Sequence, residues 1–176
     1  YRTPMLLHEF KFAMSVSYSP VIKVPITGPY TIAEWSYNEY YKTKQDLVFD
    51  LAKAINQEIK TLVENGAKFI QVDEPALPTH EDEVEWAIEA VNEAVKGVNV
   101  KVAVHICYGD YSRVLRYADR LKVDQLALEF ANRNFEPLKL FKEYKYDLEL
   151  GFGVVDVHTN KVETPDMVAK AIRKAM

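Results

Sequence analysis

The stretch KFIQVDEP, residues 68–75, is a short apolar segment that ends in two acidic residues and a proline. We predict a strand over residues 68–72, because short apolar runs bounded by turn-forming residues are typical of strands in a parallel sheet, where both faces are buried. Similar runs rich in Val, Ile, Leu or Phe predict four further strands, over residues 22–26, 100–106, 125–130 and 148–157.

Amphipathic segments separate these strands. The clearest helix begins at Thr43, whose hydroxyl can cap the backbone N–H of Asp46. Its apolar residues recur at helical spacing, and Gly66 follows as a residue typical of helix ends. Further helices are predicted over 4–18, 81–96, 111–121, 135–144 and 165–176. Strand and helix therefore alternate about five times, which indicates a parallel α/β sheet.

Composition excludes several classes of function. The 176 residues suit one domain, and 22 basic against 26 acidic residues give a net charge of −4 without the basic stripe of a nucleic-acid-binding protein. No apolar run approaches the roughly 18 residues of a membrane span, and no secretory leader opens the sequence. The single cysteine, Cys107, excludes an internal disulfide and favours a reducing compartment, which predicts a cytoplasmic protein.

Polar residues lie at the carboxyl end of every predicted strand. They are Thr27-Gly28, Asp73-Glu74, His105 with Cys107, Glu129 and His158. In a β/α barrel, the carboxyl ends of the strands form the rim at which the chemistry is done. We therefore predict one shared site at that rim.

His105 and Cys107 are two residues apart, so their side chains point to the same face of a strand. An imidazole beside a thiolate suits zinc, although a buried cysteine next to a structural histidine has the same spacing. Glu129 could supply a third ligand or form a salt bridge with Arg133 at the entry of the next helix. The residues alone leave both pairs of alternatives open.

Other strand-end residues also have a functional and a structural interpretation. Asp73 and Glu74 could bind an ammonium group or a metal, or transfer protons, or they could simply form a turn. His158 could donate a proton at neutral pH, oriented by Asp156, or it could be a solvated loop residue. Trp35 could stack on a flat ligand or pack in the core.

Five motifs occur in a fixed order along the chain. They are Thr27-Gly28-Pro29 with Trp35-Ser36, the segment IQVDEPAL at 70–77, the segment HICY at 105–108, Glu129, and the segment GVVDVH at 153–158. This series resembles the cobalamin-independent methionine synthase family. The resemblance implies a (β/α)8 TIM barrel with one zinc ion. It also implies methyl transfer to homocysteine from a methylated pterin of the 5-methyltetrahydrofolate type, which yields methionine.

The resemblance implies a role for each residue of the rim. By this resemblance, the zinc ligands are His105, Cys107 and Glu129, and the proton donor is His158. The substrate-binding residues are Asp73 for the homocysteine amino group, Glu74 beside it, and Trp35, which stacks on the pterin. The roles agree with the chemistry of the residues, because zinc prefers nitrogen and sulfur donors and a carboxylate suits an ammonium group.

The sequence also departs from the family pattern. It contains neither the second cysteine that completes the family's zinc site nor the family's first barrel strands, and it begins with Tyr1 rather than Met. We therefore expect residues 1–176 to be a single domain, the carboxyl-terminal portion of the catalytic barrel, with about five βα units and truncated at both ends. Open sheet edges would favour self-association. The alternatives are an inactive fragment, a related zinc methyltransferase with a corrinoid methyl donor, and an α/β binding domain without metal.

Overall fold

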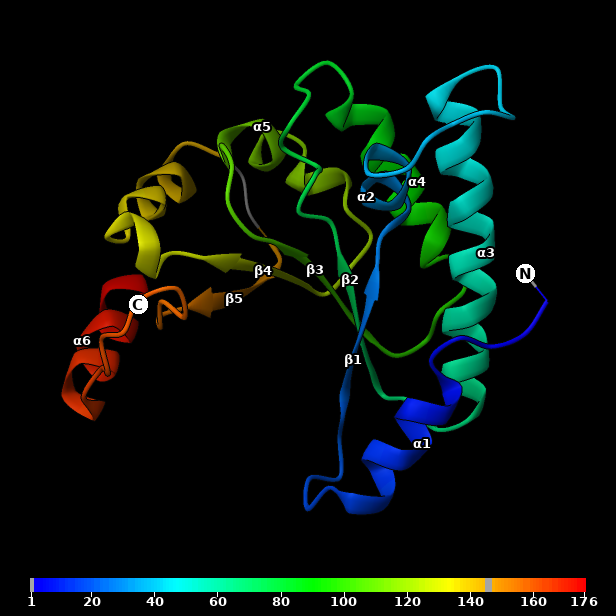
Figure 1. Ribbon diagram of the computed structural model, residues 1–176. Helices are drawn as coiled ribbons and strands as arrows, with labels where there is room; N and C mark the ends of the chain where they lie inside the picture. The colour runs from blue at the N-terminus through cyan, green and yellow to red at the C-terminus, as the bar shows by residue number, and fades with distance from the viewer. Residues whose placement is uncertain (1, 145–146) are drawn as a thin grey trace.

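The computed structural model describes residues 2–144 and 147–176 and contains a five-stranded parallel sheet (Figure 1). The strands are β1 (Lys23–Thr27), β2 (Phe69–Asp73), β3 (Lys101–Ile106), β4 (Gln125–Glu129) and β5 (Glu149–Gly153). They lie side by side in chain order, with β1 and β5 at the edges. Parallel neighbours need a crossover between each pair, so the predicted repeat of βα units is confirmed.

Helices form most of those crossovers. Helix α1 (Leu7–Val16) precedes the sheet; α2 (Pro29–Glu34) and α3 (Lys44–Glu64) follow β1; α4 (Val84–Ala94) follows β2; α5 (Ser112–Leu115) and the 3-10 helix η1 (Ala118–Arg120) follow β3; the 3-10 helices η2 (Ala131–Arg133) and η3 (Glu136–Lys142) follow β4; and α6 (Pro165–Ala175) follows β5. Figure 1 shows α3 and α4 along one flank of the sheet, α2 near its carboxyl edge and α1 near its amino edge. The architecture is that of a partial (β/α)8 barrel. Within the described residues, no helix is both long and apolar enough to cross a membrane.

Strands β1 and β2 have one apolar face and one polar face, whereas β3 and β4 each have three successive buried residues in their middle. In β2, Ile70 and Val72 are buried, whereas Gln71 and Asp73 between and after them stay partly exposed. Strand β1 has the same alternation, and the buried strand residues join those of α3 and α4 in one hydrophobic core. The prediction of strands buried on both faces is therefore wrong for β1 and β2. Their helices pack on the apolar face, and the polar face stays open.

Helix α3 follows its sequence signals closely. Thr43 Oγ1 accepts a hydrogen bond from Asp46 N at 3.1 Å, which confirms the predicted N-cap. Gly66 lies just beyond the helix with φ = +100°, a left-handed conformation that favours glycine. The buried apolar residues of α3, which pack in the core beside α4, recur at helical spacing: Val48, Ala52, Ile55, Ile59 and Leu62.

The second half of the chain differs from the sequence prediction. Strand β5 ends at Gly153 rather than residue 157, because its partner β4 ends at Glu129, opposite Gly153. The helix predicted over 111–121 is divided into α5 and η1, and the one over 135–144 is a 3-10 helix. Phe135, which precedes that helix, has φ = +66°, a left-handed conformation that is rare for residues other than glycine. Helix α2, with Pro29 at its first position, has no counterpart in the prediction.

A buried carboxylate joins α1 to α3. Glu58 on α3 is fully buried, and its oxygens accept hydrogen bonds from Met5 N at 3.0 Å and from Leu6 N at 2.8 Å. Backbone N–H groups at the start of a helix have no helical carbonyl to bind, so they need such a partner. Glu58 therefore docks the start of α1 onto α3.

We expect Glu58→Gln to lower the free energy of unfolding by about 1–3 kcal/mol, because the amide offers a single acceptor oxygen and turns its NH2 group toward backbone donors. Amide hydrogen exchange over Leu7–Val16 should accelerate at the same time. Chemical denaturation and hydrogen exchange measure the two effects. Glu64→Gln, at an exposed position near the end of α3, is the matched control. Equal stability of the two variants would contradict the prediction.

Candidate functional site

The strand register aligns three of the predicted rim residues. Thr27 at the end of β1 pairs with Asp73 on β2, and Asp73 pairs with His105 on β3. Neighbouring strands lie about 4.8 Å apart, and paired residues of parallel strands point to the same face. Thr27, Asp73 and His105 therefore share the polar face at the carboxyl edge of the sheet.

Cys107, just beyond β3, and Glu129, the last residue of the neighbouring strand β4, lie close to the same edge. Ile106 pairs with Leu128, so the residues that follow them, Cys107 and Glu129, leave the two strands at the same level. His105 and Cys107 are two positions apart, which favours the same face for both side chains. Three potential metal ligands thus come from two adjacent strands at one edge.

Local contacts orient His105. Its Nδ1 lies 3.1 Å from the carbonyl oxygen of Ala127 on the neighbouring strand. Such a contact to a backbone carbonyl is the usual support for a metal-binding histidine, because it fixes the ring and leaves Nε2 as the ligand atom.

Only one of the two carboxylate oxygens of Glu129 has a hydrogen-bond partner among the described residues. Oε1 accepts a hydrogen bond from Asn132 N at 2.8 Å, whereas Oε2 is buried with no partner among the described residues. Arg133, the alternative partner of Glu129, donates instead to the Gly109 carbonyl at 2.6 Å. A buried oxygen without a partner is costly, so Oε2 is an open position for a cation or a donor.

The surroundings of Cys107 are negatively charged. Burial raises the pKa of the Cys107 thiol, and the charges of Asp73 and Glu129 raise it further. A bound cation would have the opposite effect on the thiol. Thiol sulfur, imidazole nitrogen and an unpaired carboxylate oxygen are all donors that zinc accepts, so the donor types fit this metal. Among the described residues, however, no three His, Cys, Asp or Glu side chains lie close enough together to hold an ion.

Asp73 is supported by a residue that the sequence prediction missed. Gln71 Nε2 donates to Asp73 Oδ1 at 2.8 Å, and Gln71 Oε1 accepts from Lys23 Nζ at 2.9 Å. Gln71 and Asp73 are two residues apart on β2, so the alternation of a strand could have identified the pair. One carboxylate oxygen of Asp73 is thus held in place on the polar face.

Glu74 has a different environment from its neighbour Asp73. It is fully buried, and its carboxylate accepts hydrogen bonds from Tyr30 N at 3.0 Å, from Thr31 N at 2.8 Å and from Thr31 Oγ1 at 2.6 Å. This corrects the expectation that Glu74 binds substrate, because its oxygens are occupied beneath α2. Burial raises the pKa of Glu74 to about 7, although the hydrogen bonds from Thr31 and Tyr30 act in the opposite direction.

Trp35 lies at the surface. It is the C-cap residue of α2 and is 69% exposed, so the interpretation of Trp35 as a core residue is excluded. Tyr37 and Tyr40 in the loop that follows are also exposed. The end of α2 therefore presents aromatic surface close to the carboxyl edge of the sheet, where Figure 1 shows this helix.

His158 lies in a turn after β5 and contacts the loop that follows Cys107. Its Nδ1 is 2.7 Å from the hydroxyl oxygen of Tyr108, and the two rings pack edge to face with centroids 5.5 Å apart. Its backbone N donates to Asp156 Oδ1 at 3.0 Å. Tyr108 adopts φ = +62°, and the sequence prediction assigned it no role. No local pattern predicts its contact with His158, because the two residues are 50 positions apart.

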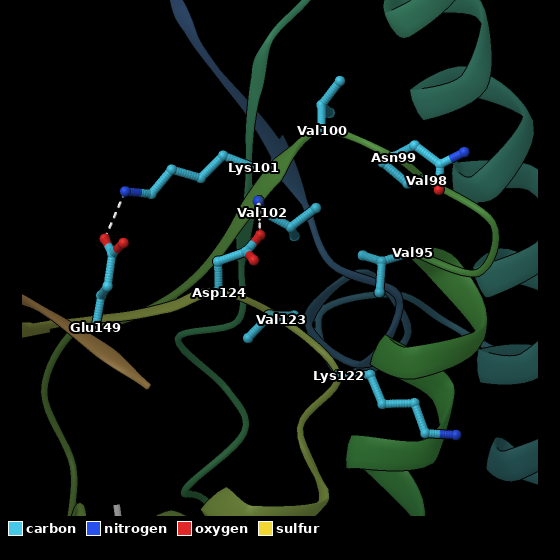
Figure 2. A pocket seen from close by; sticks show the side chains of 10 residues that line it. All are labelled: Val95, Val98, Asn99, Val100, Lys101, Val102, Lys122, Val123, Asp124 and Glu149. Carbon is cyan, nitrogen blue, oxygen red and sulfur yellow. Dashed lines mark hydrogen bonds and ion pairs between the residues drawn. The ribbon is translucent and has the colours of Figure 1, made fainter. Parts of the chain in front are cut away.

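Two of the hollows among the described residues lie at opposite ends of the strands. One of about 580 Å³ lies at the amino ends of β3 and β5, where Lys101 pairs with Glu149 and Asp124 accepts a hydrogen bond from the backbone (Figure 2). The other, of about 230 Å³, is lined in part by Asp156. Of these two, only the second adjoins the candidate site, since Asp156 contacts His158.

The fold and the edge residues together are those of part of a (β/α)8 barrel, with nitrogen, sulfur and oxygen donors at the carboxyl edge of its sheet. The family model described as "Cobalamin-independent synthase, Catalytic domain" matches residues 1–176. The chain therefore belongs to the cobalamin-independent methionine synthase family, as the sequence motifs predict.

Individual relatives agree with this assignment. The methionine synthase of Saccharolobus solfataricus is 64% identical over 176 residues, which are 100% of this chain and 53% of that protein. The methionine synthase of Sulfurisphaera tokodaii is 63% identical over 173 residues, 98% of this chain and 51% of that protein. A B12-independent methionine synthase from Shewanella sp. W3-18-1, solved in complex with selenomethionine, matches with a TM-score of 0.90 and 30% identity, over 99% of this chain and 56% of that chain. The chain thus spans about half the length of the curated relatives it matches.

The buried carboxyl group of Glu74 predicts a pH-dependent stability. With a pKa of about 7 in the folded state and about 4.3 in an unfolded chain, Glu74 binds its proton more tightly when folded. Its stabilising contribution is complete below the unfolded pKa and is lost as the pH rises through the folded pKa. Relative to the non-titrating variant Glu74→Gln, the wild-type chain should lose up to ~3 kcal/mol of unfolding free energy between roughly pH 4 and pH 8. Urea denaturation over this range is the measurement, and parallel pH profiles of the two proteins would refute the assignment.

Proposed function

We propose that this chain carries the candidate metal ligands of a methyltransferase, and that the complete protein transfers a methyl group from a methylated pterin to homocysteine to form methionine. The observation that carries the proposal is the common edge of His105, Cys107 and Glu129, with an unpaired buried oxygen on Glu129 among the described residues. Membership of the family over the whole chain supports it. The selenomethionine complex of the Shewanella relative supports a binding site for the product amino acid.

The proposed metal is zinc. His105 Nε2, Cys107 Sγ and Glu129 Oε2 would hold it, together with a fourth ligand from elsewhere in the complete protein. Zinc held there would supply the Lewis acidity that deprotonates a substrate thiol at neutral pH, at which a free thiol with a pKa near 8.5 is mostly protonated. The negative charge of Cys107 and Glu129 would keep that sulfur electron-rich and therefore nucleophilic.

Asp73 is suited to bind the ammonium group of homocysteine. Its carboxylate is partly exposed at the carboxyl edge, in register with His105. Gln71 occupies Oδ1, so the second oxygen can accept a hydrogen bond from the substrate. Such an ion pair would fix the amino-acid end of homocysteine near the strand that carries His105 and Cys107.

His158 is suited to supply the proton of the reaction. As the bond between homocysteine sulfur and the methyl carbon forms, the bond from that carbon to N5 of the pterin breaks, and N5 retains the electron pair. N5 then takes up a proton, which a histidine can deliver near neutral pH. Tyr108 and Asp156 hold His158 through its ring and its backbone. Trp35 would stack on the pterin ring with its exposed indole.

The metal proposal is tested by zinc content. In the full-length protein that carries this chain, His105→Ala, Cys107→Ser and Glu129→Gln should each lower bound zinc and methyl transfer about 10-fold or more, because each removes a ligand atom. Elemental analysis of purified protein measures the metal. His8→Ala, at an exposed position on α1, is the control and should keep its zinc. Full zinc occupancy in the three ligand variants would overturn the assignment.

His158→Asn tests the proton donor. It should lower turnover of the full-length protein by about 10²-fold, the usual effect of a lost general acid, while zinc content stays at the wild-type level. Steady-state kinetics and elemental analysis on the same sample separate the two effects. Loss of zinc together with activity would make His158 a metal ligand, and wild-type turnover would remove it from the mechanism.

The methyl donor is tested by direct comparison. Full-length protein is supplied with homocysteine and either 5-methyltetrahydrofolate or methylcobalamin, and methionine is measured. The proposal expects methionine from the methylated pterin. Methionine from methylcobalamin alone would favour a corrinoid-dependent methyltransferase. No methionine from either donor, with zinc bound, would refute the proposed reaction.

A further inference from the structure

Two adjacent acidic residues leave β2 in different environments. Asp73 is partly exposed at the carboxyl edge, whereas Glu74 is fully buried beneath the start of α2. The buried carboxylate uses both oxygens: Oε1 accepts from Tyr30 N, and Oε2 accepts from Thr31 N and Thr31 Oγ1. Hydrogen bonds to a buried carboxylate are stronger than those between neutral groups, so this contact ties α2 firmly to the end of β2.

Thr31 completes the connection in both directions. Its Oγ1 donates a hydrogen bond to Glu74 and accepts one from Ala76 N at 3.2 Å. Ala76 lies two positions after Glu74 in the chain. The carbonyl oxygen of Thr31 accepts from Trp35 N at 3.1 Å. A short path of hydrogen bonds and one helical turn therefore leads from the residue after Asp73 to the exposed indole of Trp35.

The strand-to-helix turn before α2 is shaped around the same carboxylate. A Cβ atom on Gly28 would lie 2.2 Å from Glu74 Oε1 and 2.3 Å from its carboxyl carbon, much closer than van der Waals contact allows. The backbone of Gly28 has φ = −75°, which any residue can adopt. Glycine is thus required here by the position of the Glu74 side chain and not by backbone conformation.

The far end of α2 is also fixed. Glu34 forms an ion pair with Lys44 at the start of α3, and its Oε1 lies 3.0 Å from Nε2 of His80 in the loop after β2. Lys44 also pairs with Glu83, just before α4. With its first turn held by Glu74 and its last by Glu34, α2 is a rigid support for Trp35.

We propose that Glu74 is a positioning residue: through Thr31 and α2 it holds Trp35, the surface for the methyl donor, at a fixed place relative to Asp73, the contact for the amino acid. The roles of Trp35 and Asp73 rest on the proposed function, whereas the coupling itself rests on the hydrogen bonds of Glu74. Glu74 touches neither substrate. Its removal should therefore impair binding of the methyl donor while homocysteine binding, which depends on the sheet and Gln71, is largely retained.

A matched control separates positioning from general stability. Glu58 is also a fully buried glutamate that binds backbone N–H groups at a helix start, but it serves α1 at the opposite end of the strands. In the full-length protein, Glu74→Gln should raise the KM for the methyl donor about 10-fold, or about 1.4 kcal/mol, with the KM for homocysteine within about 2-fold of wild type. Glu58→Gln should lower thermal stability and leave both KM values unchanged.

A double-mutant cycle tests the link between Gly28 and Glu74. Gly28→Ala alone should displace the Glu74 carboxylate and raise the KM for the methyl donor as Glu74→Gln does. In a Glu74→Ala background the new methyl group meets no carboxylate, so Gly28→Ala should add little further effect. Additive effects of the two substitutions would show that Gly28 acts independently of Glu74 and would overturn the proposed link between them.

The position of Trp35 is measured directly by fluorine NMR of protein labelled with 5-fluorotryptophan, with the Trp35→Phe variant used to identify the resonance. The Trp35 signal should shift or broaden in Glu74→Gln and stay unchanged in Glu58→Gln. An unmoved signal in Glu74→Gln, or equal increases of both KM values, would overturn the positioning role. A moved signal with an unchanged methyl-donor KM would support the positioning role and instead refute Trp35 as the donor contact.

Discussion

The parallel register of the sheet determines where the candidate functional residues at the ends of β1 to β4 lie. Thr27, Asp73 and His105 come from three separate βα units, yet strand pairing sets them at one level on one face. The next step of the ladder sets Cys107 and Glu129 beside each other in the same way. A register shift by one residue would turn a strand's polar side chains toward the helices and its apolar ones toward the open face. Core packing and the candidate site therefore depend on the same set of backbone hydrogen bonds.

That dependence explains why residues of the site and residues of the core are so close in the chain. Buried and partly exposed side chains alternate along β2, so Asp73 lies on the open face of the sheet. The turn that follows buries Glu74 against α2. One carboxylate is thereby available to a ligand, while the other holds the helix that carries Trp35. The barrel rim thus combines exposed polar groups with a buried polar support directly beneath them. Such support is what keeps a binding site near its productive geometry.

Sequence reasoning succeeded where the signal is local. The strands and α3 were predictable, because apolar runs, the cap at Thr43 and the glycine at 66 act within a few residues. It failed where packing overrides local preference: β5 ends where its partner ends, and Phe135 adopts a left-handed conformation before η3. In the site, residues at strand ends could be identified from position alone. Gln71 could have been found from its spacing to Asp73, whereas the supporting role of Tyr108 could not.

The amino-acid sequence by itself determined the alternation of strands and helices, the donor residues at the strand ends and the family to which the chain belongs. Only the tertiary structure decided that Glu74 is buried under α2, that one oxygen of Glu129 lacks a partner among the described residues, and that Tyr108 meets His158. The physical reason is the range of the interactions. Periodicity and capping act between residues a few positions apart, whereas these contacts join segments that become neighbours only after the strands have paired and the helices have packed.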